Sequence, residues 1–372
     1  MVDEKEVRTE NNSAQATDKS VEKWFSHFGW SKNPFILNIE PRLLVGYEEQ
    51  RDKLLRHIQE NQKVALVIGP TGSGKTTLLK WCEAHLDPTF ESIFLGKPPE
   101  RPENFIDIFR NKFKPSIIEY LSQIFFNKSI SLNELPSYIN KKLGKKTLVL
   151  FCDEIHEATQ DVLSWLRVLN DQVENMTLII SGLPVFEKRL KKELESFYKR
   201  ITTKITTLSL TKEETRQLIE KRIKKVGGSG TGPFSDNVID YIYDKTGGFP
   251  REVLCLANQL INLAMESSTF EIRPEILEHK KEKAVEENFD VINNLPSRQR
   301  EIVKILQLSD SSPNQIVSKL DLKKYKTKQH AVRSVNNILK RLLKNKIVTR
   351  KVSGKTYIYV LSSKYKTLGA ES

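Results

Sequence analysis

The sequence predicts an α/β protein whose parallel sheet carries helices on both faces, followed by an all-α segment and a small domain of three helices and a hairpin. Three observations support this fold class. Short apolar runs alternate with segments of helical periodicity between residues 47 and 210, a pattern typical of buried parallel strands and their covering helices. From Thr211 to about residue 288 the pattern is purely helical. The chain then ends in two alternating strands around Ser353–Gly354, which predicts a hairpin.

The first part of the chain contains the elements of the predicted sheet. Met1 to Ser20 is polar and is expected to be a disordered tail. The aromatic-rich stretch WFSHFGWSKNPFILNIE that follows is expected to be an irregular lead-in that packs on a domain. Strands are expected at 63–68, 147–152, 176–181 and 201–210. Helices are expected at 47–61, over most of 115–143 and at about 158–173. A further helix is expected directly after the first strand and its glycine loop.

The rest of the chain is expected to be helical up to the final hairpin. Helices are expected at 211–225, 235–246, 250–266 and roughly 274–288, then in LPSRQREIVKILQL, in SSPNQIVSKL and at 329–345. Three helices followed by a hairpin is the order of a winged helix-turn-helix. The predicted domains are a tail (1–20), a core domain (21–210), a helical lid (211–268), a helical linker (269–294) and a winged-helix domain (295–372).

Charge is strongly segregated along the chain. The net charge is +13, and residues 290–372 hold all of this excess, with 18 Lys and Arg against 5 Asp and Glu. This segregation favours a polyanionic partner for the C-terminal end over a merely solvated basic surface. No apolar run reaches the length of a membrane span, and the three cysteines are widely spaced in apolar stretches. We therefore expect reduced cysteines and a cytoplasmic location.

The strongest motif is a glycine-rich loop between an expected strand and an expected helix, as in phosphate-binding loops. It comprises Gly69, Pro70, Thr71, Gly72, Ser73, Gly74, Lys75, Thr76 and Thr77. The glycines let backbone N–H groups turn toward phosphates, and the helix N-terminus adds positive potential. We expect Lys75 to reach the β- and γ-phosphates of ATP and the Thr76 hydroxyl to bind Mg²⁺.

A pair of carboxylates follows the second expected strand of the core, in LVLFCDE. We expect Asp153 to hold Mg²⁺ through water and Glu154 to orient and deprotonate the attacking water. Adjacent carboxylates at a strand end are common, so the prediction depends on their placement in the same sheet as Lys75. His156 is expected to be an ordinary residue at the start of the next helix.

With these two motifs the chain resembles the AAA+ ATPases. Residues from about 28 to 267 are similar to the branch with the ExeA-type secretion ATPases and the target selectors MuB and TnsC, and to the archaeal origin-recognition/Cdc-type initiators. The resemblance rests on NPF, GPTGSGKTTLL, DEIHEATQDVLSWLRVLND, LIISGLPVFEKRL, YKRITTKITTLSLTKEET and GGFPREV. The basic C-terminal domain is closer to the initiators, which also place a winged helix after the lid.

The resemblance implies further site residues in the core domain. Ser181, at the end of the third expected strand, matches the first sensor position. Arg200 matches the arginine finger, which in this family reaches the γ-phosphate bound to a neighbouring subunit. Lys199 and Arg189 are the alternatives for this role, and an ordinary surface charge is the other interpretation of Arg200.

Arg251 matches the second sensor, a lid arginine that contacts the γ-phosphate of the bound nucleotide. Pro250 suits the first position of a helix, so Arg251 lies in its first turn. A cation there faces the positive end of the helix dipole, which is unfavourable unless an anion lies nearby. ATP is one such anion, and the alternative is a solvated arginine partly offset by Glu252.

The longest helix of the basic domain has two distinct faces. Val332, Val335, Leu339 and Leu342 form an apolar stripe that is expected to pack on the other helices. The residues expected to contact DNA are Arg333, Asn337, Lys340 and Lys344 on another face of this helix, with Lys351 and Lys355 in the hairpin. The hairpin tyrosines Tyr357 and Tyr359 are expected to pack on the sheet. Winged helices also bind proteins, and the charge segregation favours duplex DNA.

Together these features predict an ATP-binding and ATP-hydrolysing AAA+ protein that binds duplex DNA through a winged helix. Its expected role is a nucleotide-controlled replication initiator, loader or target selector, with ATP and Mg²⁺ as cofactors. We expect a homo-oligomer with ATP at subunit interfaces and a partner protein in replication, transposition or transcription. The alternatives are an ATP-dependent regulator of transcription or signalling and an ExeA-like assembly ATPase of a membrane machine.

Overall fold

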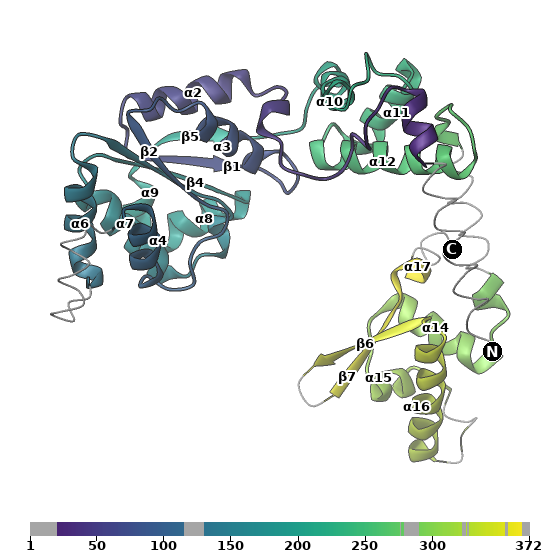
Figure 1. Cartoon of the computed structure of the whole chain (residues 1–372). Coiled ribbons are helices and arrows are strands. Elements are labelled where there is room, and N and C mark those ends of the chain that lie inside the picture. Colours follow the sequence, from purple (N-terminus) through teal and green to yellow (C-terminus); the bar gives the residue numbers. More distant parts are fainter. Residues whose placement is uncertain are drawn as a thin grey trace, which may run out of the picture. The chain divides into compact units, whose positions relative to one another are not determined.

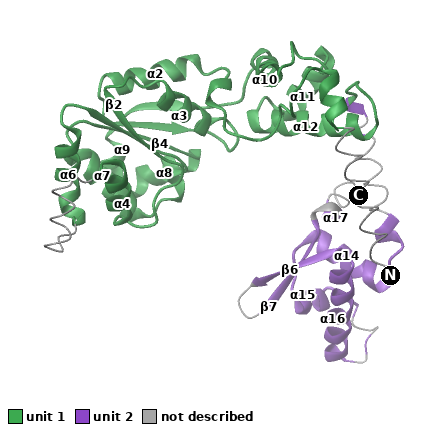
Figure 2. Cartoon of the chain, in the orientation of Figure 1, with its two compact units in different colours: residues 1–273 green, residues 274–372 purple. Residues whose placement is uncertain are grey.

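The computed structural model describes residues 21–114, 130–275, 277–278, 290–321, 325, 327–353 and 356–366. The chain divides into two compact units, Met1–Arg273 and Pro274–Ser372, coloured green and purple in Figure 2. The expected disordered tail, most of the expected helix at 274–288 and Lys355 lie outside the described residues. The finer division into five parts stays a prediction.

The first unit contains a parallel sheet of five strands in the order β2-β3-β4-β1-β5. The strands are β1 (Val64–Ile68), β2 (Phe90–Leu95), β3 (Thr147–Cys152), β4 (Met176–Gly182) and β5 (Ile201–Thr206). The three inner strands are almost entirely buried. Burial on both faces explains their continuous apolar sequences. Because the strands are parallel, the segments that follow their carboxyl ends lie at the same end of the sheet.

Helices cover both faces of this sheet, as predicted (Figure 1). On one face, α4, α6, α7, α8 and α9 contribute to a single hydrophobic core with alternate residues of the strands, such as Leu66 and Leu150. These helices are Asn104–Lys112, Leu135–Leu143, Gln160–Gln172, Pro184–Glu193 and Glu195–Tyr198. The helices α2 (Glu48–Gln59) and α3 (Lys75–Ala84) lie on the other face.

Two strands differ from the sequence prediction. The sheet contains β2, which was not among the four expected strands. Its residues are mostly half-buried. It therefore lacks the apolar run that indicates an inner strand. β5 ends at Thr206 instead of continuing to Leu210. The backbone leaves the sheet there because Leu208 O and Leu210 N make hydrogen bonds with Tyr47 and Gly248 instead.

Three helices form the lid, α10 (Lys212–Lys225), α11 (Asp236–Thr246) and α12 (Pro250–Glu266), close to their predicted bounds. Thr211 caps α10 in a capping box with Glu214. Gly247 and Gly248 adopt left-handed backbone conformations, and Pro250 begins α12. The prediction that two glycines end one helix and a proline starts the next is confirmed.

The aromatic lead-in packs on the lid helices. The side chains of Trp24, Trp30 and Phe35 are buried, and Trp24 Nε1 donates to the carbonyl of Thr269 at 2.8 Å. Phe35 lies in edge contact with Phe234, with ring centroids 5.2 Å apart. The lead-in therefore belongs structurally to the lid, although the sequence places it before the core.

The second unit contains α14 (Ser297–Leu308), α15 (Pro313–Ser318), α16 (Lys328–Lys344), β6 (Val348–Ser353), β7 (Thr356–Leu361) and α17 (Ser363–Lys366). β6 and β7 pair antiparallel. One hydrophobic core joins these elements, including Val335, Leu339 and Leu342 of the predicted stripe. Ser312 caps α15 ahead of Pro313. Three helices and a hairpin in this order are compatible with a winged helix.

Candidate functional site

The glycine-rich loop lies between β1 and α3, and α3 begins at Lys75. Gly72 and Gly74 have φ angles of +79° and +89°, which only glycine adopts without strain. Gly69 is constrained by space instead, because a Cβ there would lie 2.1 Å from Thr207 Oγ1. The sequence motif thus forms a tight loop in which three glycines are each required for a physical reason.

Lys75 lies almost completely buried beneath this loop. Its Nζ donates to the carbonyls of Gly69 at 3.0 Å and Pro70 at 2.9 Å. Burial lowers the pKa of Lys75, and the nearby carboxylates of Glu154 and Asp153 act in the opposite direction. The ammonium is thus positioned in a poorly hydrated site, where an anion interacts with it more strongly than in water.

Asp153 connects the loop to the neighbouring strands of the sheet. Its buried carboxylate accepts a hydrogen bond from Thr76 Oγ1 at 2.5 Å through Oδ2 and another from the buried Ser181 hydroxyl through Oδ1. A carboxylate and a hydroxyl oxygen in contact are the hard ligands that Mg²⁺ prefers, and it usually keeps several waters. These two residues therefore fit a magnesium ion, although no cluster of three metal-ligating His, Cys, Asp or Glu side chains occurs in the described ranges.

Glu154 directly precedes the 3-10 turn η3 (Ile155–Glu157) and has a left-handed backbone, with φ of 50° and ψ of 34°. Its N–H donates to Asp153 Oδ1 at 2.9 Å. The side chain is 41% exposed and lies 3.3 Å from His156 Nδ1, measured from Oε2. Glu154 is thus a partly hydrated carboxylate beside a buried one, an arrangement that suits a base acting on water.

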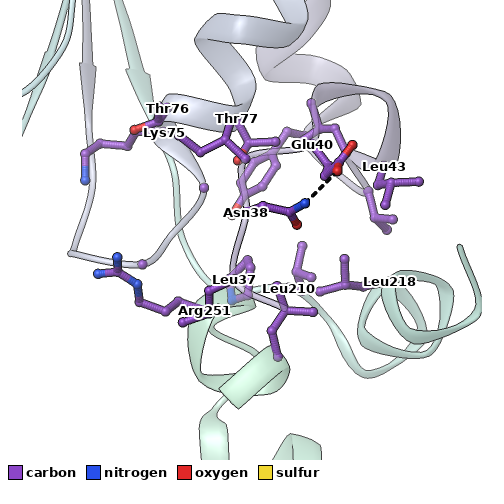
Figure 3. Close-up of a pocket in the computed structure, with 18 of the residues that line it drawn as sticks. Leu37, Asn38, Glu40, Leu43, Lys75, Thr76, Thr77, Leu210, Leu218 and Arg251 are labelled. Carbon is purple, nitrogen blue, oxygen red and sulfur yellow. Dashed lines mark hydrogen bonds between the residues drawn. The ribbon is translucent and has the colours of Figure 1, made fainter. Parts of the chain in front are cut away.

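A pocket of about 410 Å³ lies between the loop and the lid. Its polar lining includes Lys75, Thr76, Glu154 and Arg251. Its apolar lining includes Leu37, Ile39, Leu43, Leu44, Val45, Leu210, Leu218 and Leu254. Figure 3 shows Lys75 and Arg251 on one side of the pocket and Leu43 and Leu218 on the other. A lining with both charged and apolar side chains suits a ligand that carries phosphates and a nucleobase.

Arg251 lies in the first turn of α12, next to the glycine-rich loop. Its N–H donates to the carbonyl of Gly72 at 3.3 Å. A Cβ built on Gly72 would lie 3.0 Å from Arg251 Cβ. Arg251 therefore lies next to the loop, and its exposed side chain lines the pocket. Its contact with a γ-phosphate stays a prediction.

Comparison with known proteins agrees with this geometry. Residues 56–190 match the family model described as "AAA domain". The chain has an AAA+ fold of the origin-recognition/Cdc6 type. It is similar to Cdc6p of Pyrobaculum aerophilum, with a TM-score of 0.52, 16% identity and coverage of 90% of this chain and 95% of that chain. A search of curated protein sequences finds no significant match.

Two Aeropyrum pernix proteins have a similar AAA+ fold. The ORC1 protein in complex with DNA has a TM-score of 0.50 and 17% identity, covering 86% of this chain and 89% of its own. The ORC2 protein, in ADPNP-ADP complexes, has a TM-score of 0.51 and 16% identity, covering 88% and 93%. These matches cover more of the chain than either unit contains, so they extend over parts of both units.

Arg200 lies away from the pocket of its own chain. It directly precedes β5, whereas the glycine-rich loop follows the parallel strand β1, so the two lie at opposite edges of the sheet. Arg200 Nε and Nη2 donate to Asp171 at 2.7 and 2.8 Å. A finger role therefore requires a second chain and release of this ion pair, and it stays a prediction.

Several pocket residues were not expected from the sequence. Tyr47 is buried, and its hydroxyl lies 2.7 Å from Ser73 O and 2.6 Å from Leu208 O. Burial raises the pKa of this phenol. Tyr47 follows Gly46 at the start of α2 and has a φ of 61°. The sequence signal was weak, since a tyrosine at a helix start has no single functional meaning.

A second unexpected group in the pocket wall is polar. The buried Arg222 of α10 donates to Asn38 Oδ1 at 2.9 Å and to the carbonyls of Ile36 and Asn38, each at 3.2 Å. Asn38 Nδ2 donates to Glu40 Oε1 at 2.7 Å, the dashed bond in Figure 3. Arg222 therefore fixes the lead-in as one wall of the pocket, a contact between residues 184 positions apart.

The second unit has an exposed polar face on α16. Arg333, Asn337, Lys340 and Lys344 are all exposed on this helix, and Lys351 is exposed on β6. Tyr359 is buried, whereas Tyr357 is 45% exposed and lies under the Arg350 guanidinium, 4.6 Å from the ring centroid. The expectation that both tyrosines pack on the sheet thus holds for Tyr359 only. The described basic residues are accessible to a polyanion.

Proposed function

We propose that this chain binds and hydrolyses ATP and binds duplex DNA through its C-terminal unit, as a nucleotide-controlled replication initiator, loader or target selector. The observation that carries the proposal is the convergence of Lys75, Thr76, Asp153, Glu154 and Arg251. These residues come from the loop, a strand end and the lid, and they lie around or directly behind one pocket. The Aeropyrum pernix ORC2 protein, which has this fold, is described in ADPNP-ADP complexes.

Each residue has a proposed task in this reaction. Lys75 neutralises the β- and γ-phosphates once its bonds to Gly69 and Pro70 are exchanged for phosphate oxygens. Thr76 and Asp153 hold Mg²⁺, which supplies positive charge to the phosphate oxygens when bound. Ser181 keeps the Asp153 carboxylate in place by donating to it.

Glu154 acts on the water that attacks the γ-phosphate. Its carboxylate lines the pocket and is partly hydrated, so it accepts a hydrogen bond from that water and then its proton. Arg251 provides positive charge on the lid side, where its exposed guanidinium has access to the γ-phosphate. Both residues act on the phosphates, while the nucleobase packs on the apolar side chains of the lining.

DNA binding is proposed for the α16 face and the hairpin of the second unit. Support comes from the exposure of Arg333, Asn337, Lys340, Lys344 and Lys351 and from the charge excess of residues 290–372. Lys355, outside the described residues, belongs to the same proposal from sequence. The Aeropyrum pernix ORC1 protein of similar fold is described in complex with DNA.

The decisive test is ATP turnover by the full-length chain with and without duplex DNA. We expect Mg²⁺-dependent release of phosphate, loss of nucleotide binding in Lys75→Ala, and a change in turnover when duplex DNA is added. Turnover without any response to DNA would leave the ATPase assignment intact and contradict nucleotide control of DNA binding. An absence of both nucleotide binding and turnover in the wild-type chain would contradict the whole proposal.

A further inference from the structure

The backbone of Glu154 adopts a conformation that is uncommon for a residue with a side chain. Its φ of 50° is in the left-handed region, directly before the 3-10 turn η3. Such conformations cost on the order of 1–3 kcal/mol and persist only where surrounding contacts enforce them. The direction of the Glu154 carboxylate depends on this backbone, so the groups that hold the turn determine where the proposed base lies.

The N-terminal side of the turn is held by Asp153. Its Oδ1 accepts the Glu154 N–H at 2.9 Å and also the Ser181 hydroxyl of β4. β4 continues to Gly182, where an added Cβ would lie 3.2 Å from Ile155 Cγ2. The end of β4 thus packs closely on the beginning of the turn.

The C-terminal side of the turn is held by Arg189 of α8. Nη1 donates to the carbonyl of His156 at 3.2 Å, and Nη2 donates to the carbonyl of Ala158 at 3.1 Å. The hydrogen bonds inside the turn use other carbonyls, those of Glu154 and Ile155. Arg189 therefore adds two bonds that the turn does not make by itself.

The Arg189 side chain is itself fixed in direction. Nε donates to Glu193 Oε2 at 2.9 Å, one turn further along α8, and the side chain is 31% exposed. An arginine held at Nε presents its two terminal nitrogens as a planar fork, which a lysine cannot reproduce. The fork spans two carbonyls that are two residues apart.

We infer that Arg189 is a positioning residue for Glu154, acting within the same chain, and not an arginine finger for a neighbouring chain. The inference rests on the proposed ATPase function. Arg189 touches no atom of the pocket directly, and it acts by holding η3 in the conformation that aims the Glu154 carboxylate at the water.

The test compares Arg189→Gln and Arg189→Lys with Lys188→Gln in the full-length chain. Lys188 is an exposed neighbour on the same helix, so its variant removes the same charge without touching η3. We expect Arg189→Gln to lower kcat about 10- to 100-fold, as for a displaced catalytic group. The Kd for a fluorescent ATP analogue with Mg²⁺ is expected to change less than about twofold. Arg189→Lys should fall between Arg189→Gln and wild type, and Lys188→Gln should resemble wild type.

Two further measurements distinguish positioning from a general structural effect or a finger. In a Glu154→Gln background, adding Arg189→Gln should change the residual single-turnover rate less than about twofold, because both changes act through one group. Mixing Arg189→Gln chains with Lys75→Ala chains should not restore activity, because the defect lies in the chain that binds ATP.

The inference would be overturned by an unchanged kcat in Arg189→Gln, by an equal loss of rate with and without Glu154, or by recovered turnover on mixing, which would make Arg189 a finger. Loss of nucleotide affinity in parallel with kcat would indicate a general packing role and would also overturn it. Failure of the wild-type chain to turn over ATP would instead contradict the proposed function, so the two failures are distinguishable.

Discussion

At the residue scale, the charged side chains of Lys75 and Glu154 lie in one pocket but suit different roles. Lys75 is buried and held by two carbonyls, so it is suited to bind anions, whereas Glu154 is partly hydrated and suited to move a proton. We therefore predict that Glu154→Gln retains ATP binding and lowers kcat by about 10²- to 10⁴-fold, the range for a general base. Nucleotide binding and single-turnover hydrolysis measure the two effects separately. Wild-type turnover in this variant would exclude Glu154 as the base.

A second residue, His57, makes the stability of the first unit depend on pH. It is buried on α2, and its Nδ1 lies 2.9 Å from Thr203 Oγ1 of β5. Burial lowers the pKa of His57 to about 4, below the value of about 6.5 in an unfolded chain. His57 is therefore neutral in the folded chain. Its contribution to the free energy of unfolding is fully present above pH 6.5 and is lost as the pH falls toward 4.

We predict that wild type loses about 2 kcal/mol of unfolding free energy between pH 7 and pH 5 through this residue. His57→Asn should lack that part of the pH dependence, whatever its stability at pH 7. Urea unfolding at several pH values measures the difference between the two proteins. Parallel pH profiles would show that the pKa of His57 is the same in the folded and the unfolded chain.

At the scale of elements, the junction between α11 and α12 couples the lid to the core. Leu210 N donates to Gly248 O at 2.9 Å, and Arg251 N donates to Gly72 O at 3.3 Å. The same short segment thus contacts both the end of the core and the glycine-rich loop. Gly248 has a φ of +74°, and a Cβ there would lie 2.1 Å from Leu210 O.

We predict that Gly248→Ala destabilises the first unit by about 2 kcal/mol or more, because it combines a left-handed backbone with overlap against a backbone atom. Nucleotide affinity should fall as well, since Pro250 and Arg251 shift with the junction. Gly96→Ala is the matched control, because its Cβ meets nothing within 4 Å and its φ is not left-handed. Thermal unfolding and nucleotide titration are the measurements, and equal behaviour of the two variants would contradict the coupling.

At the scale of the whole molecule, the position of Arg200 makes its proposed role depend on assembly. Arg200 is paired with Asp171 at the amino ends of the strands, opposite the end where the glycine-rich loop lies. If it acts on a neighbouring chain, turnover per chain should rise with protein concentration. Mixing Arg200→Ala with Lys75→Ala should restore part of the activity, because the Lys75→Ala chain can supply its Arg200 to the intact nucleotide site of the Arg200→Ala chain. A rate independent of concentration, with no restoration, would argue against the finger role.

The DNA binding proposed for the second unit predicts how the whole molecule responds to salt. Binding that neutralises phosphates should weaken with salt, with a log–log slope of roughly −0.9 per contact on duplex DNA. We predict that Lys351→Ala lowers affinity for all sequences and reduces the slope by about 1, whereas Arg333→Ala or Asn337→Ala alters sequence preference. Footprinting and salt titration of the full chain measure these effects. An absence of binding at low salt would favour a protein-interaction role for this unit.

Much of the fold could be predicted from sequence because the signals are local. Inner strands have continuous apolar runs, and helix ends have their own residues, such as Ser312 before α15 and Pro250 at the start of α12. The edge strand β2 was not predicted, because half-exposed residues have no distinctive period. The candidate site could be predicted where one short segment contains all its chemistry, as in the glycine-rich loop and in Asp153–Glu154.

Sequence alone therefore determined the strand–loop–helix around Lys75, the carboxylate pair at the end of β3, the helical lid and the basic C-terminal unit. Each of these depends on neighbours along the chain, whose periodicity and capping follow from backbone geometry. Only the tertiary structure decided that Arg222 fixes Asn38 in the pocket wall and that Arg189 holds the turn after Glu154. These contacts join residues 31 to 184 positions apart. Local sequence patterns do not indicate which distant side chain forms a given hydrogen bond. That partner depends on how the folded sheet and lid bring the segments together.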